Sequence, residues 1–174
     1  MDSENIKSEA TSEELERCYR TAMLTVAGFI VLTVLLVAIA FLATNAITRP
    51  GDAWAVGALR IAGAIFGVGA IVHRRIKFAP MRLQDIAGVR GTSGLLHTLK
   101  MGTIELASIG GAIALMGFMG TVLSGSPLEM LYLGVVALAI LLLYSFPKKG
   151  AWKKLVESIQ QQDIADATTK GTLA

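Results

Sequence analysis

The sequence predicts an all-α, multi-pass membrane protein with four transmembrane helices and both termini in the cytoplasm. Of its 174 residues, 53% are hydrophobic and only 17% are charged, and the mean hydropathy is +0.61, which is outside the usual range of soluble domains. The apolar residues also gather in four runs, each long enough to cross about 30 Å of hydrocarbon as a helix. A strong asymmetry of Lys and Arg between the connecting segments completes the case.

The four predicted spans cover residues 21–44, 54–72, 101–124 and 128–146. The first contains no ionisable residue, while the second, third and fourth contain Arg60, Glu105 and Glu129, respectively. The fourth ends before Pro147, which lacks the N–H group that a continuing helix needs. Together the spans form a membrane domain over residues 21–147.

Positive charges predict the orientation, because Lys and Arg near span ends are retained in the cytoplasm. The loop 73–100 and the tail 148–174 are basic, whereas the two other loops carry only Arg49 and Asp52. The basic loop contains Arg74, Arg75, Lys77, Arg82, Arg90 and Lys100, and the tail begins with Lys148, Lys149, Lys153 and Lys154. Both basic segments should therefore be cytoplasmic. Since no targeting segment is recognisable, we expect the inner (plasma) membrane.

Three segments outside the spans carry weaker helical signals. Thr11 and Glu14 fit a capping box, so a helix should begin near Ser12 within the cytoplasmic segment 1–20 and continue into the membrane. In the basic loop, residues 81–91 predict a short helix that lies on the membrane surface or docks a cytoplasmic partner. Residues 152–161 predict a short amphipathic helix in the C-terminal tail.

Small residues predict where the helices pack, since they let backbones approach closely in lipid. The second span has the pair Gly63 and Gly67, and the third has Gly110, Gly111 and Ala114. We therefore expect the second and third spans to form the buried pair. The first and fourth, rich in Leu, Val and Ile, should face lipid or a partner.

Charges inside a membrane span require a partner or a function. Arg60 lies six residues beyond Trp54, roughly 9 Å below the outer boundary, and Glu129 lies only about 3 Å inside the same boundary. Because an arginine side chain can extend toward the interface, these two residues can form an ion pair between the second and fourth spans. We expect this pair to be structural rather than part of an ion pathway.

Glu105 admits two interpretations. In the structural one, its carboxylate is paired at the inner membrane boundary, with His73 or Arg74 as the expected partner. In the functional one, it is a protonatable group that carries a proton. The sequence favours the structural interpretation without excluding the other.

The second and third spans also resemble a known hairpin. Residues 57–72, GALRIAGAIFGVGAIV, and residues 95–120, LLHTLKMGTIELASIGGAIALMGFMG, are similar to the proteolipid subunit c of rotary ATP synthases. That family pairs a glycine-rich helix with a helix that carries a proton-binding carboxylate, so the resemblance implies that Glu105 is a proton carrier. The chain departs from the family in its long basic loop, in its two additional spans and in Arg60.

No pattern in the sequence indicates an enzyme, a cofactor or a metal site. His73 and His97 have neither a cysteine nor an acidic cluster at ligand spacing, and no phosphate-binding or nucleophile motif occurs. The basic loop is explained by anionic lipid headgroups at the cytoplasmic face, which makes a nucleic-acid partner unnecessary. Its candidate lipid- or partner-facing residues are Arg74, Arg75, Lys77, Arg82 and Arg90.

Two functions follow from these observations. The first is a structural or accessory membrane subunit that acts through helix–helix contacts, in a homo-oligomer or with a partner membrane subunit. The second is a proton- or ion-translocating transporter component that uses Glu105. The small number of charged residues in the spans favours the first.

Overall fold

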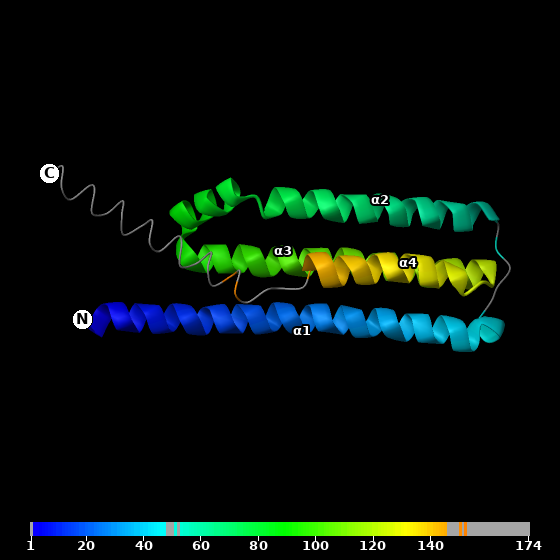
Figure 1. Cartoon of the computed structure of the whole chain (residues 1–174), viewed down its shortest axis with the longest axis horizontal. Helices are drawn as coiled ribbons and strands as arrows, with labels where there is room; N and C mark the ends of the chain where they lie inside the picture. The colour runs from blue at the N-terminus through cyan, green and yellow to red at the C-terminus, as the bar shows by residue number, and fades with distance from the viewer. Residues whose placement is uncertain (1, 48–50, 52, 146–149, 151, 153–174) are drawn as a thin grey trace.

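The computed structural model confirms an all-helical chain whose helices run side by side (Figure 1). It describes residues 2–47, 51, 53–145, 150 and 152. Helix α1 covers Asp2–Ile47, α2 Ala53–Lys77, α3 Pro80–Ser124 and α4 Leu128–Ala139, and α4 continues as a π-helical turn, η1, over Ile140–Ser145. Within these residues there is no strand, and four helices are long and apolar enough to cross a membrane.

Two ends of the bundle can be distinguished (Figure 1). The tight turn between α3 and α4 at Gly125 marks the turn end. The connection between α2 and α3 and the N-terminus of α1 lie at the other end, which we call the basic end because α2 finishes there with Arg74, Arg75 and Lys77. The lysines at 148, 149, 153 and 154, the loop residues Arg49 and Asp52, and the expected tail helix beyond Trp152 lie outside the described residues.

Helix α2 packs mainly against α3, as expected, but these two helices are not the buried pair that the sequence predicted. Helices α3 and α4 are the more buried. In the most apolar 18-residue stretch of each span, 50% of the residues are buried for α3 and 44% for α4 with η1, compared with 22% for both α1 and α2. Helices α1 and α2 flank this central pair on opposite sides (Figure 1). The fourth span is therefore central, because α4 packs on α3 directly after the short turn at Gly125.

The small residues explain this arrangement. A Cβ atom placed on Gly63 of α2 would lie 2.6 Å from Leu133 Cδ2 of α4, and one on Gly67 would lie 3.6 Å from Val136 Cγ1. The glycine pair of α2 thus admits side chains of α4, not of α3. This outcome could not be read from the sequence, since the spacing of small residues defines a face but not the helix that covers it.

Helix α3 presents small residues to both of its other neighbours. A Cβ atom on Gly110 would lie 3.0 Å from Leu141 Cγ, and one on Gly111 would lie 2.5 Å from the Phe29 ring of α1. Ala114 is fully buried in the apolar cluster that joins α3 to α4. These contacts place α3 at the centre of the bundle.

The expected loop over residues 73–100 is mostly helical. Helix α2 continues to Lys77, and α3 begins at Pro80 and changes direction at Gly91, whose φ of 67° is a conformation that glycine adopts without a steric penalty. The first part of α3 turns its apolar side into the protein, with Leu83 and Ala87 buried. That apolar side is therefore not available to lie on a membrane surface.

A second apolar core lies at the basic end, beyond the level of Glu105. We call it the end core, and it consists of Leu15, Ala22, Leu83, Ala87, Leu95, Leu96, Leu99 and Trp152. The Trp152 ring packs edge-on against Tyr19 with ring centres 6.1 Å apart. Helix α1 begins at Asp2 rather than near Ser12, and its early residues supply this core with Leu15. The basic end thus has a folded core of its own.

Replacing Gly111 by Val should destabilise the protein by about 1–3 kcal/mol, because the added methyl groups would overlap the Phe29 ring. Gly69→Val is the matched control, since nothing lies within 4 Å of a Cβ atom at Gly69. Thermal unfolding in one detergent, followed by circular dichroism, measures both effects. Phe29→Ala should recover part of the loss in the Gly111→Val background. Equal stability of the two glycine variants would contradict the packing of α1 on α3.

Candidate functional site

Two charged clusters connect helices that are far apart in the sequence. The turn-end pair consists of Arg60 on α2 and Glu129 on α4, and the basic-end triad consists of His73 and Lys77 on α2 with Glu105 on α3. These clusters include each charged residue that the sequence analysis placed inside a span. They are the candidate functional groups of the bundle.

The turn-end pair is bidentate. Arg60 Nε donates a hydrogen bond to Glu129 Oε2 at 2.9 Å, and Arg60 Nη2 donates to Glu129 Oε1. The two partners are unequally exposed, with 61% of the Arg60 side chain accessible and only 6% of the Glu129 side chain. The structure thus brings together the two residues that the sequence paired, and the carboxylate is the buried member.

The α3–α4 turn positions Glu129. Gly125 ends α3 in a left-handed conformation, with φ 68°, and its N–H group donates to the Thr121 carbonyl at 2.9 Å. Thr121 Oγ1 accepts a hydrogen bond from the Met130 N–H group at 3.1 Å, so a side chain of α3 satisfies a free donor in the first turn of α4. Glu129 packs over Gly120, where a Cβ atom would lie 3.4 Å from Glu129 Cβ. The carboxylate consequently projects toward α2.

The basic-end triad shares one carboxylate between two partners on α2. Glu105 Oε2 lies 2.9 Å from His73 Nε2 and 2.9 Å from Lys77 Nζ, and Lys77 Nζ also donates to Oε1 at 3.2 Å. His73 and Lys77 are four residues apart and therefore lie on one face of α2. The Glu105 side chain is 40% exposed, so the triad lies at the surface of the bundle rather than inside it. Of the two partners considered for Glu105, the structure selects His73.

Arg74 has a different role. It donates from Nη1 to the Leu143 carbonyl at 3.0 Å, and its guanidinium lies 5.0 Å from the centre of the Tyr144 ring. The last carbonyl groups of a helix have no partner within that helix, and a cation near this terminus is favourable. Arg74 therefore joins the end of α2 to the end of η1.

A long apolar segment separates the two clusters. His73 and Arg60 are 13 residues apart on α2, or about 20 Å along the helix axis. Between the levels of the clusters, no Asp, Glu, His, Lys or Arg occurs on any of the four helices. The buried threonine hydroxyls donate to carbonyls of their own helices, as Thr33 does to the Phe29 carbonyl at 2.8 Å, and Thr121 also accepts from Met130 of α4. Ser145 Oγ is the exception in the described part, since it is buried without a partner.

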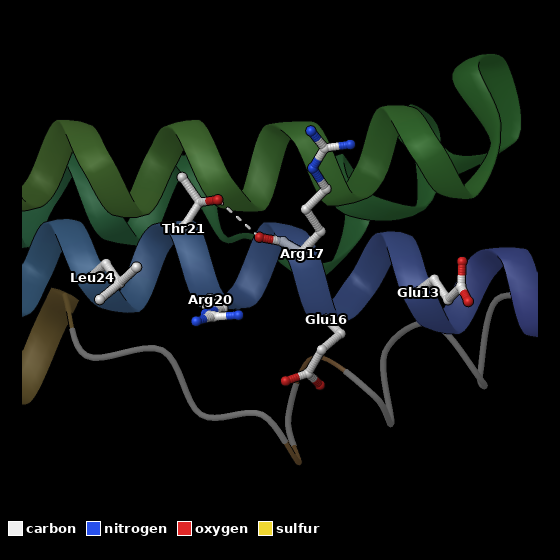
Figure 2. A pocket seen from close by; sticks show the side chains of 6 residues that line it. All are labelled: Glu13, Glu16, Arg17, Arg20, Thr21 and Leu24. Atoms are coloured by element: carbon white, nitrogen blue, oxygen red, sulfur yellow. Dashed lines mark hydrogen bonds between the residues drawn. The ribbon is translucent and has the colours of Figure 1, made fainter.

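A hollow of about 360 Å³ lies against α1 at the basic end. Figure 2 shows the side chains that line it. Its described lining comes from one helix and consists of Glu13, Glu16, Arg17, Arg20, Thr21 and Leu24. The Thr21 hydroxyl donates to the Arg17 carbonyl at 2.9 Å, which leaves it bonded to its own helix. The polar lining is solvent-exposed and has no arrangement of groups suited to catalysis.

No group of three or more His, Cys, Asp or Glu side chains gathers in the described residues in a way that could hold a metal ion. No family model, curated protein or solved structure matches this chain. Its function must therefore be inferred from the two clusters and from the surfaces that the bundle exposes.

The interactions of three residues, Lys77, Arg74 and Thr121, were not predicted from the sequence. Lys77 was assigned to the lipid-facing loop, although its spacing of four from His73 was a signal that both could reach one carboxylate. Arg74 was predicted to lie in the same loop and to be a possible partner of Glu105, but it binds the Leu143 carbonyl, which no sequence pattern indicates as its acceptor. Thr121 was not singled out, because a hydroxyl that bonds to the next helix depends on the turn that joins them.

Arg60→Gln should lower the midpoint of thermal unfolding more than Glu129→Gln does. The first variant leaves a carboxylate that is 6% exposed without its cation, whereas the second leaves a guanidinium that can reach water. The double variant should be more stable than Arg60→Gln alone, because neither charge is then left unpaired. Unfolding in a fixed detergent, followed by circular dichroism, gives all three midpoints. A larger loss for Glu129→Gln would show that the carboxylate is not the constrained partner.

Proposed function

We propose that this chain is a small, non-enzymatic accessory subunit of a membrane protein assembly. In this proposal its four helices cross the inner (plasma) membrane, and both termini and the basic end are cytoplasmic. It acts through helix–helix contacts, either with further copies of itself or with another membrane subunit.

The observation that carries the proposal is that the charges inside the spans are already engaged within the chain. Glu129 is bound by Arg60, and Glu105 is bound by His73 and Lys77. About 20 Å of bundle without an Asp, Glu, His, Lys or Arg side chain separates the two clusters. A route for ions through a single copy would need polar groups along that distance, so the arrangement favours a structural role.

The exposed faces supply the surface for such contacts. Helix α2 buries only a narrow stripe, made of Val56, Gly63, Gly67 and Ala70. Its other faces expose large apolar side chains at Ile61, Ile65, Phe66, Val68, Ile71 and Val72. Helix α1, on the opposite side of the bundle, exposes Leu24, Val31, Val34, Leu35, Phe41 and Leu42. Each flanking helix can therefore pack against lipid or against a helix of another subunit.

The orientation rests on the distribution of cations. Helix α2 has Arg74, Arg75 and Lys77 in its last turn, at the basic end, and the turn between α3 and α4 has no charged residue from Gly125 to Leu128. Retention of positive charge in the cytoplasm then places the basic end inside. The end core would lie next to the inner leaflet, in contact with the aqueous phase.

A proton- or ion-translocating component that uses Glu105 is the alternative. It is favoured by one observation, that the Glu105 side chain is 40% exposed and so can exchange protons with its surroundings. The resemblance of the second and third spans to the subunit c hairpin remains a prediction. Two partners on α2 compete with any transported ion for this carboxylate, which is why we prefer the accessory role.

Glu105→Gln distinguishes the two functions. The accessory role predicts that this variant, purified from its native membrane in mild detergent, shows a weakened assembly, while proton flux in liposomes is unchanged. Wild-type particles should have a mass well above the 18.4 kDa of one chain. Glu13→Gln is the control, because Glu13 is exposed and lies outside the triad. A single-chain wild-type particle would refute the accessory role, and pH-driven flux that is lost in Glu105→Gln would establish the alternative.

A further inference from the structure

Contacts between the helices show which residues lie at the same depth along the bundle. Glu105 of α3 contacts His73 of α2, so these two residues are level. One buried cluster contains Val26 of α1, Ala107 of α3 and Leu141 of η1. Val26 is therefore level with Ala107, so depths along α1 can be compared with depths along α3. Each further residue along a helix then adds about 1.5 Å of depth.

On this scale, three cations lie at nearly the same depth on three helices. Arg75 lies two residues beyond His73, about 3 Å from the level of Glu105 toward the basic end. Lys100 lies five residues before Glu105, at about 8 Å, and Arg20 lies six residues before Val26, at about 6 Å. The three side chains thus define a layer about 5 Å thick. We call Arg20, Arg75 and Lys100 the cation layer.

In the described part of the protein, the side chains of these three cations form no ion pair or hydrogen bond. Arg20 and Arg75 are exposed, Lys100 is partly exposed, and none of the three takes part in a hydrogen bond or ion pair with another described residue. Their neighbours in sequence differ, since Lys77 is bound to Glu105 and Arg74 to the Leu143 carbonyl. No Asp or Glu lies at the depth of the layer on α1, α2 or α3.

The cations surround the bundle instead of converging on one point. Arg20 is on α1 and Arg75 is on α2, and these helices lie on opposite sides of α3 (Figure 1). One small anion cannot contact both. A plane of anions can contact all three, and the headgroup layer of a bilayer leaflet is such a plane.

We propose that the cation layer binds the headgroups of anionic phospholipids in one leaflet, the cytoplasmic one. This inference rests on the membrane topology proposed above and adds to it a lipid class and the residues that select it. The layer begins directly beyond Glu105, where the uncharged part of the bundle ends, so it coincides with the phosphate groups next to the hydrocarbon. Cations near the membrane surface attract anionic lipid. The turn end has no comparable layer in the described residues, because Arg60 there is bound to Glu129.

The test uses the full chain in phosphatidylcholine vesicles that contain phosphatidylglycerol. Spin-labelled lipids measure the association of phosphatidylglycerol with the protein relative to phosphatidylcholine. In the variant with Arg20→Gln, Arg75→Gln and Lys100→Gln, this preference should fall to about half of the wild-type value or less. The control carries Lys7→Gln, Arg82→Gln and Arg90→Gln, which remove the same charge at positions outside the layer. Although the sequence predicted that Arg82 and Arg90 face lipid or a partner, the proposal expects this control to retain the wild-type preference.

Several results would overturn the proposal. An equal loss in both variants would mean that total charge, not the layer, attracts the lipid. Displacement of the labelled phosphatidylglycerol by millimolar inorganic phosphate would mean that the cations bind a discrete anion. Flotation of the vesicles checks insertion separately. A chain that does not float with them refutes the membrane topology itself, whereas an inserted chain without lipid preference refutes only the cation layer.

Discussion

The proposed membrane topology depends on one constraint, that a charge in hydrocarbon must have a partner or reach the interface. Arg60 and Glu129 meet it near the turn end, and Glu105 meets it at the basic end through His73 and Lys77. Both contacts join α2 to the central helices, and the stretch of about 20 Å between them contains only uncharged side chains. The two clusters therefore fix the position of α2 along the bundle, while Gly63 allows Leu133 of α4 to approach α2 closely. Without these clusters, α2 would contact its neighbours mainly through apolar side chains. Such contacts would do little to fix its position along the bundle axis.

The bundle also has two apolar cores of different kinds. The core between the charged clusters joins α3 and α4 through Ala114, Met130, Leu133 and Ala137, in surroundings that are themselves apolar. The end core lies beyond Glu105 and has exposed charged residues around it, such as Glu16, Arg82 and Asp85. In water, burial of Leu95, Leu96 and Trp152 provides a hydrophobic driving force that is missing within lipid. In the proposed topology, the basic end would fold as a small aqueous cap on the membrane domain.

The sequence predicted the helices better than it predicted their neighbours. Four apolar runs were sufficient for four helices, since a polar backbone can cross lipid only with its hydrogen bonds made internally. The contact of Arg60 with Glu129 also follows from depth alone, because each residue lies close to the same boundary. In contrast, the central position of α4 was not predicted, and the short helix predicted over residues 81–91 packs its apolar side into the protein instead of lying on a membrane surface. The second feature depends on Gly91, where α3 changes direction and Leu83 and Ala87 join Leu95 in the end core, and a glycine in a basic segment does not by itself predict such a contact.

The central claim is that the bilayer lies between the turn end and the basic end, and cysteine accessibility tests it most directly. In a Cys18→Ser background, single cysteines at Ser126, Val68 and Met81 would sample the turn, the middle of α2 and the basic end. A membrane-impermeant maleimide should label Ser126→Cys in intact spheroplasts and Met81→Cys only after permeabilisation. Val68→Cys should stay unlabelled in both conditions, although its position is 63% exposed in the isolated chain. Labelling of Val68→Cys, or labelling of Ser126→Cys and Met81→Cys from the same side, would contradict the account.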